Sequence, residues 1–228
     1  MCIRDRTYCD DYVELVKARA YGETTNPAAA ASARSALGTS LGVLLRCFAP
    51  FLPYCTEEAW SWWHDGSVHR APWPLESDLL DAAGAGPRTE LLGAVSEVLG
   101  SIRRAKSEAH RSMREPVVSC TVSGPSQLAE LVALEMCIRD RYGTRPMVTP
   151  RIPDRPSLDG LEAKWSKRWE SDGTYHFDRS KDRSEVYSID TPPPTVSGSL
   201  HTGHVFSYSQ TDMVARFQRC LLYTSRCV

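Results

Sequence analysis

The chain has 228 residues, with 27 basic and 28 acidic side chains, so its net charge is close to zero. That balance gives no global reason to expect nucleic-acid binding, which would have to depend on a local basic patch. No apolar run approaches twenty residues, and the N-terminus lacks the apolar core of a signal peptide, so we expect neither a membrane span nor a signal peptide.

Apolar residues at three- and four-residue spacing dominate the first part of the chain. They predict a helix from Asp10 to Tyr21 that stops at Gly22. Pro27 then opens an alanine-rich second helix. The apolar stripe of that helix consists of Leu37, Leu41, Leu44, Leu45 and Phe48.

Prolines at 50 and 53 interrupt the second helix, and Thr56 is placed to cap a new helix that continues to Trp60. The remaining expected elements are a rigid extended connector over 68–74, a helix over 88–111 and a short strand over 117–122. The first half is therefore predicted to be mainly α, with three to four antiparallel helices and a small α/β appendage.

The stretch 101–114 carries six basic or histidine side chains. The four that we expect to contact a phosphate backbone are Arg103, Arg104, Lys106 and Arg111. The alternative is that this stretch is only a solvated helix face. Tryptophans 60, 62, 63 and 73 are candidates for stacking on bases, although we expect at least two of them to serve packing instead.

A hexapeptide, Met-Cys-Ile-Arg-Asp-Arg, occurs unchanged at 1–6 and at 136–141, while the flanking residues do not match. Structural repeats are longer and only approximate, so this is not a repeat architecture. The hexapeptide resembles translated sequencing-adapter sequence, as does the tail 220–228. We therefore expect 136–141 to be a junction between two pieces, 7–135 and 142–219. A genuine short motif used twice is the alternative.

The second piece is predicted to contain a helix over 152–169, a strand over 184–190 and a helix over 205–219. A glycine-containing turn separates the strand from the last helix. Strand, turn and helix in this order make the first half of a βαβ nucleotide-binding unit. The predicted architecture is thus a helical bundle followed by an incomplete α/β, Rossmann-type fragment. Without further strands, its strand should expose an unpaired edge, and we expect this half to be poorly ordered.

The sequence Pro-Pro-Pro-Thr-Val-Ser-Gly-Ser-Leu-His-Thr-Gly-His occupies 192–204. Imidazoles at His201 and His204, placed at a helix N-terminus, can stabilise negative charge on a nucleotide phosphate. Gly203 has no Cβ and so permits close approach of a ligand or of the backbone. Ser199 belongs to the entry turn. We predict His201 and His204 as catalytic residues and all four residues as an ATP site.

Metal binding is the alternative for the two histidines, but no cysteine or carboxylate stands beside them at ligand spacing. The eight cysteines also lack Cys-x-x-Cys pairs and matching histidines. We therefore expect no metal site and reduced cysteines that act as small apolar side chains. A disulfide or zinc framework is the competing interpretation.

Residues 8–135 resemble the C-terminal, anticodon-binding region of the valyl-tRNA synthetase family, a class I aminoacyl-tRNA synthetase. The stretches that carry the resemblance are 12–22, 45–60, 67–74 and 104–109, with Ser-Val-His-Arg-Ala-Pro-Trp-Pro at 67–74 favouring the valine member. Residues 151–219 resemble the opposite, N-terminal end of the same family. The two pieces thus stand in reversed order.

The resemblance implies a valine–tRNA ligase, which activates valine with ATP and transfers it to tRNA. It implies ATP as substrate with Mg²⁺, tRNA(Val) and valine as partners, a monomer, no membrane and a cytoplasmic location. It also places Pro193, Pro194 and Thr195 beside the amino-acid substrate. Thr202 departs from the family, which commonly has a larger apolar residue there.

The second ATP signature of the family, Lys-Met-Ser-Lys-Ser, does not occur in the 228 residues, nor does the inserted editing domain. We therefore expect this polypeptide to be inactive as a fragment. A stand-alone helical tRNA-binding module without catalysis is the alternative function. A natural rearranged protein with the hexapeptides as linkers is a third.

Overall fold

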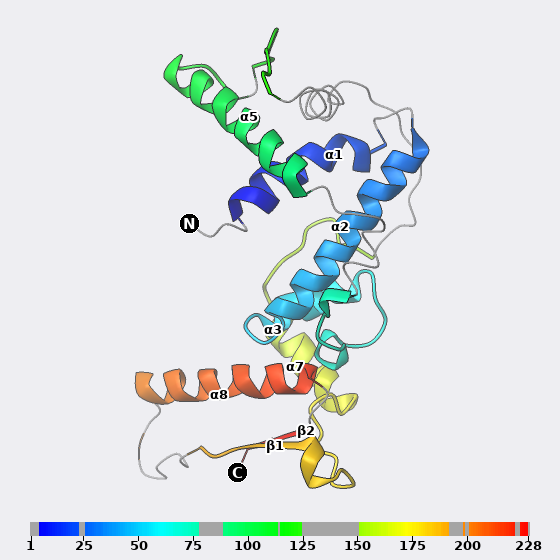
Figure 1. Cartoon of the computed structure of the whole chain (residues 1–228). Coiled ribbons are helices and arrows are strands. Elements are labelled where there is room, and N and C mark those ends of the chain that lie inside the picture. The colour runs from blue at the N-terminus through cyan, green and yellow to red at the C-terminus, as the bar shows by residue number, and fades with distance from the viewer. Residues whose placement is uncertain are drawn as a thin grey trace. The chain divides into compact units, whose positions relative to one another are not determined.

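The computed structural model describes residues 5–22, 26–77, 89–113, 115–124, 151–191, 198, 201–221 and 224–227 (Figure 1). These residues are mainly helical, as predicted. The chain separates into two compact units, one formed by 1–38 and 80–146 and the other by 39–79 and 147–228. The second unit therefore combines residues from both pieces expected from the sequence, while the predicted borders at 135 and 142 remain predictions.

The first unit contains the predicted N-terminal helix, which begins as a π-helical segment, η1 (Asp5–Val13), and continues as α1 (Glu14–Ala20). It ends where predicted, because Gly22 adopts a φ of 78° that favours glycine. Helix α5 (Thr89–Glu108) matches the helix predicted over 88–111. Arg103 of α5 holds η1 by donating to the Asp11 carboxylate at 2.6 Å.

The short strand predicted over 117–122 is absent. These residues are extended, but the described part of the chain offers them no strand partner, and Val118 is 98% exposed. A β-strand needs ladder hydrogen bonds to a neighbour, so β-branched residues alone do not make one here.

Helix α2 (Pro27–Phe48) begins at its predicted proline, preceded by Asn26, whose side chain accepts from the backbone of Ala28 at 3.0 Å. Its residues 27–38 belong to the first unit and its residues 39–48 to the second. In the second unit the predicted stripe contributes Leu45 to a small core. The other members of this core are Leu41, Ala49, Ala59, Trp60 and Val68.

Helix α3 (Pro53–Ser61) starts earlier than predicted, because Pro53 occupies the first helical turn, where a missing N–H costs nothing. The prediction that Thr56 caps this helix is therefore wrong. Its hydroxyl instead donates back to the Leu52 and Pro53 carbonyls from inside the first turn. A short 3₁₀ helix, η2 (Val68–Arg70), interrupts the connector predicted to be extended.

Helix α7 (Leu161–Ser171) is shorter than the helix predicted over 152–169. Residues 151–158 are not helical, since Pro153 and Pro156 disfavour helical backbone in the residues before them. Gly160 precedes the helix with a φ of 75°.

Strand β1 (Val186–Ile189) follows a 3₁₀ turn, η3 (Arg183–Glu185), and lies within the predicted strand region. Helix α8 (Thr202–Cys220) connects it to β2 (Thr224–Cys227). The two strands pair in parallel with Val186 opposite Thr224, which completes one small βαβ unit. The tail thus gives β1 a strand partner that was not expected, on one edge only, and the other edge of β1 has no strand beside it within the described residues.

Helix α2 is also long and apolar enough, by length and composition alone, to cross a membrane. It contributes Leu41 and Leu45 to the core just described, but only 17% of its most apolar window is buried. The sequence-based expectation of no membrane span thus remains a prediction.

Candidate functional site

The predicted nucleotide signature lies at the start of α8. His201 is the N-cap residue, and its Nδ1 accepts from the Gly203 backbone N–H at 3.0 Å. His204 reaches back, and its Nδ1 accepts from the His201 N–H at 3.3 Å. The two rings lie 4.0 Å apart and satisfy N–H groups that a helix start otherwise leaves unpaired. Because both Nδ1 atoms accept, the protons of the neutral rings belong on Nε2.

Gly203 is required by this arrangement. A Cβ at Gly203 would lie 2.9 Å from Cε1 and 3.0 Å from Nδ1 of His201, closer than normal packing allows. The sequence predicted that the missing Cβ of Gly203 would allow a ligand or the backbone to approach closely. In the structure the His201 ring occupies that space. His201 is exposed, so its remaining ring atoms face solvent at the helix N-terminus.

Other predicted members of the site lie outside the described residues. These are Ser199 of the ATP site and Pro193, Pro194 and Thr195 beside the amino acid. Their roles remain predictions.

Of the four predicted tRNA-contacting residues, all in the first unit, two hold other parts of that unit and two are exposed. Arg103 is engaged internally, with Asp11 and with the Asp10 carbonyl at 2.7 Å. Lys106 donates to the carbonyls of Met113 and Glu115. The remaining two, Arg104 and Arg111, are exposed.

Arg111 forms a 3.3 Å ion pair with Glu115. Arg104 has no hydrogen bond or ion pair of its side chain within the described residues. Arg104 and Arg111 are thus the members best placed to meet an external phosphate.

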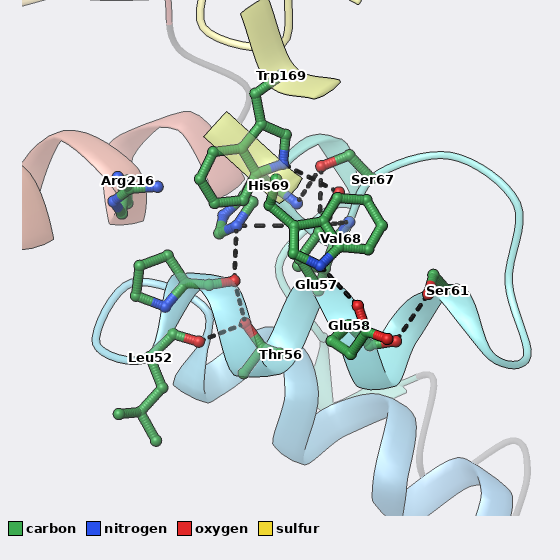
Figure 2. Close-up of polar contacts among 12 residues, drawn as sticks. Leu52, Thr56, Glu57, Glu58, Ser61, Ser67, Val68, His69, Trp169 and Arg216 are labelled. Carbon is green, nitrogen blue, oxygen red and sulfur yellow. Dashed lines mark hydrogen bonds and ion pairs between the residues drawn. The ribbon is translucent and has the colours of Figure 1, made fainter. Parts of the chain in front are cut away.

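The second unit contains a buried polar cluster that sequence analysis missed (Figure 2). Glu57 of α3 is 2% exposed, and both of its carboxylate oxygens are hydrogen-bonded. Oε1 accepts from the Trp169 indole at 3.1 Å, while Oε2 accepts from the Ser67 hydroxyl at 3.0 Å and the Val68 N–H at 2.9 Å. Burial raises the pKa of the Glu57 carboxyl, and these donors oppose the rise.

His69 of η2 lies against this carboxylate, with 3.9 Å between Nε2 and Glu57 Oε2. Burial, followed by the positive charge of Arg216, lowers the pKa of His69 to about 3. The imidazole is therefore neutral at pH 7, and the contact is no ion pair there. Nε2 lies 3.3 Å from the Pro53 carbonyl, which requires a donor, so Nε2 carries the proton and Nδ1 is left without a partner in the described structure.

Aromatic and guanidinium groups close the cluster. The ring of Trp169 lies edge-on to His69 at 5.0 Å and to Tyr175 at 5.3 Å. The guanidinium groups of Arg216 and Arg219 stand 4.9 and 5.1 Å from the Tyr175 ring, within cation–π range. Burial raises the pKa of the Tyr175 phenol, which is therefore neutral at physiological pH.

Two tryptophans serve packing, as expected. Trp60 adjoins the core, and Trp73 meets Phe217 edge-on at 4.8 Å. In the described part of the chain no group of three His, Cys, Asp or Glu side chains could hold a metal ion. Five of the cysteines in this part of the chain are free thiols: Cys9, Cys47, Cys55, Cys120 and Cys220.

Comparison with known families matches two different segments. Residues 5–121 match the anticodon-binding domain of tRNA ligase. Residues 164–226 match the class I tRNA synthetases for isoleucine, leucine, methionine and valine. The first match covers η1 to α5. The second begins within α7, includes β1 and the His201–His204 signature, and ends within β2.

Curated relatives agree on the valine enzyme. A valine–tRNA ligase of Salinispora tropica is 50% identical over 147 residues, which cover 59% of this chain and 17% of the relative. One of Thermobifida fusca is 72% identical over 68 residues, 30% of this chain and 8% of the relative. One of Cutibacterium acnes is 49% identical over 131 residues, 57% of this chain and 15% of the relative. The chain thus spans less than a fifth of these relatives. No solved structure matches it.

Proposed function

Because the chain belongs to the anticodon-binding domain family of tRNA ligases, we propose that it derives from a valine–tRNA ligase. The parent reaction joins valine to ATP as valyl-adenylate with release of pyrophosphate, then transfers the valyl group to a ribose hydroxyl of tRNA(Val). The observation that carries this proposal is the imidazole capping box at the start of α8, in the segment that matches class I synthetases.

The geometry of that helix start supports phosphate chemistry. Each Nδ1 is used internally, so the Nε2–H of His201 and of His204 is the donor left for a ligand. A helix N-terminus carries partial positive charge, which adds to the attraction for the α-phosphate as negative charge develops on it. Mg²⁺ would arrive with the nucleotide phosphates, since the described residues contain no cluster of three metal ligands.

We propose further that a polypeptide of these 228 residues catalyses neither step, because its sequence lacks the Lys-Met-Ser-Lys-Ser signature. Valine-dependent pyrophosphate exchange tests this, with a His201→Ala/His204→Ala variant as the control. Equal, background exchange by both is expected. Exchange by the unchanged chain above that control would contradict the proposed inactivity and at the same time support the site.

A tRNA-binding module is the second candidate, favoured by the exposed side chains of Arg104 in α5 and Arg111 just after it. Electrostatic binding to phosphates would weaken steeply as salt rises. Reversing Arg104 and Arg111 to glutamate should lower tRNA affinity, whereas Arg103 is unsuitable for this test because it holds Asp11. Salt-dependent tRNA retention that is indifferent to the reversal would exclude this helix as the contact.

A translation enzyme of this class acts where tRNA, valine and ATP are available, so we place it in the cytoplasm as a monomer without membrane attachment. Sedimentation of the purified chain tests the monomer. Flotation with lipid vesicles tests membrane attachment through α2, which is the one helix in the described residues with sufficient length and apolar character.

A further inference from the structure

The second unit joins residues from two regions that are distant in sequence and match different families. Residues 53–74, comprising α3, η2 and the segment after it, belong to the anticodon-binding match. Helix α7 from residue 164 onward and all of α8 lie in the class I synthetase match. Residues 80–146, which connect the two regions along the chain, belong to the other compact unit. The two regions are therefore held together by direct contacts between their own residues.

Adjacent glutamates of α3 receive donors from tryptophans one helical turn apart on α7. Glu57 accepts from the Trp169 indole at 3.1 Å. Glu58 accepts from the Trp165 indole at 2.8 Å and from Lys164 at 2.5 Å. Burial alone would raise the pKa of Glu58, but these donors outweigh it and lower the pKa, so the carboxylate is charged at pH 7. Two specific pairs thus fix α7 on α3.

Further contacts surround these pairs. The ring of Tyr54 stacks on Trp169 at 5.0 Å, and its hydroxyl lies 3.3 Å from Ser166 Oγ. Arg70 of η2 donates to the carbonyls of Asp172 and Gly173 at 3.1 and 2.7 Å, just where α7 ends. A cation at that position satisfies carbonyls that the helix leaves unpaired.

The same segment also contacts the C-terminal end of α8. The Trp73 N–H donates to the Cys220 carbonyl at 2.9 Å, and its ring packs edge-on against Phe217. Tyr175 lies between Trp169 and the two arginines of α8. Trp169 is buried, and Tyr175 and the two arginines beside it are half-buried. Tryptophan, tyrosine and arginine are the residues most often found at the energetic centre of a protein–protein interface.

We propose that residues 53–74 are a docking surface for a polypeptide that carries α7, Tyr175 and α8, with the contact between Glu57 and Trp169 at its centre. The two regions bind each other without the covalent connection through 80–146. The partner that this surface fits is thus the entry segment of the synthetase catalytic domain. This proposal is independent of any catalytic activity or tRNA binding.

Cutting the intact protein tests it. Residues 136–141 are replaced by the six-residue recognition sequence of a site-specific protease, and the purified chain is cleaved under native conditions. The two fragments should co-elute in size-exclusion chromatography at micromolar concentration. Tryptophan fluorescence should be unchanged by cleavage, because all six tryptophans belong to the second unit.

Variants of the cleaved protein locate the contact. Trp169→Ala should weaken association at least about thirtyfold, as expected for a central anchor. Trp169→Phe, which retains a ring but loses the donor, should weaken it about tenfold. Trp63→Ala is the matched control within the same segment, since Trp63 is 46% exposed and its ring lies against Trp62.

Separation of the unmodified fragments after cleavage would overturn the proposal. So would equal affinities of the Trp169 and Trp63 variants. Circular dichroism before cleavage identifies any variant that fails to fold, and the unmodified cleavage result stands without the variants.

Discussion

The buried neutral histidine predicts how the second unit responds to acid. The pKa of His69 is about 3 in the folded chain and 6.5 in the unfolded chain. Between pH 6.5 and 3, His69 is therefore protonated only when the chain is unfolded. Stability is therefore complete above pH 6.5 and is lost progressively as the pH falls towards 3. Each pH unit in this window corresponds to about 1.4 kcal/mol, so acidification from pH 7 to 5 should cost about 2 kcal/mol.

Neighbouring groups also titrate, so the effect is isolated by comparison with His69→Gln. The pKa of Glu57 is raised on folding, which has the opposite sign, because its stability contribution increases as the pH falls. The variant retains Glu57, Tyr175 and Arg216. Subtracting its pH dependence from that of the unmodified chain therefore leaves the His69 contribution, apart from coupling between adjacent groups.

Urea unfolding followed by tryptophan fluorescence is the assay, since every tryptophan reports on the second unit. The unmodified chain should lose about 2 kcal/mol more than His69→Gln between pH 7 and 5. The exposed His64 provides the control, and His64→Gln should behave like the unmodified chain. Equal losses by the unmodified chain and His69→Gln would refute the assignment of a buried neutral imidazole.

Three other substitutions test individual contacts. Gly203→Ala should destabilise the protein by about 1 kcal/mol in thermal unfolding, because the new Cβ would displace the His201 ring that caps α8. In the His201→Ala background, where that ring is already absent, Gly203→Ala should have little additional effect. Trp169→Phe should cost about 1.4 kcal/mol in urea unfolding, the equivalent of the tenfold loss of association, since a buried carboxylate loses its donor. Arg103→Ala should lower the free energy of unfolding by about 1–3 kcal/mol, because it leaves Asp11 buried without its cation. Unfolding followed by circular dichroism should report this loss, and an unchanged free energy of unfolding would indicate that Asp11 becomes hydrated instead.

Local signals predicted the helices well. Pro27 and Gly22 marked helix boundaries because their backbone preferences act within one or two residues. The start of α8 was predicted close to its true position, since the glycine and histidines that build it are three residues apart. The helix predicted over 152–169 failed at its start because a local signal was underused, since Pro153 and Pro156 disfavour helical backbone in the residues before them.

The buried cluster could not be predicted in the same way. Glu57 and Trp169 are 112 residues apart, and nothing local distinguishes this glutamate from a solvated one. The only hints were two adjacent glutamates on one predicted helix and two tryptophans one turn apart on another. Similarly, β1 pairs with β2, which begins 38 residues after it. Strand β2 belongs to the tail 220–228, which the sequence analysis interpreted as adapter-like and therefore not as part of the fold.

Helix α2 is shared by both compact units, and this affects how the protein unfolds. Two glycines, Gly38 and Gly42, lie at the boundary, and each weakens a helix interior by about 1 kcal/mol relative to alanine. Nothing lies within 4 Å of a Cβ at either position, so no packing compensates. Amide hydrogens on either side of Gly38 should therefore exchange in separate cooperative steps. Alanine at both positions should merge these steps into one, so that the two halves of the chain unfold together.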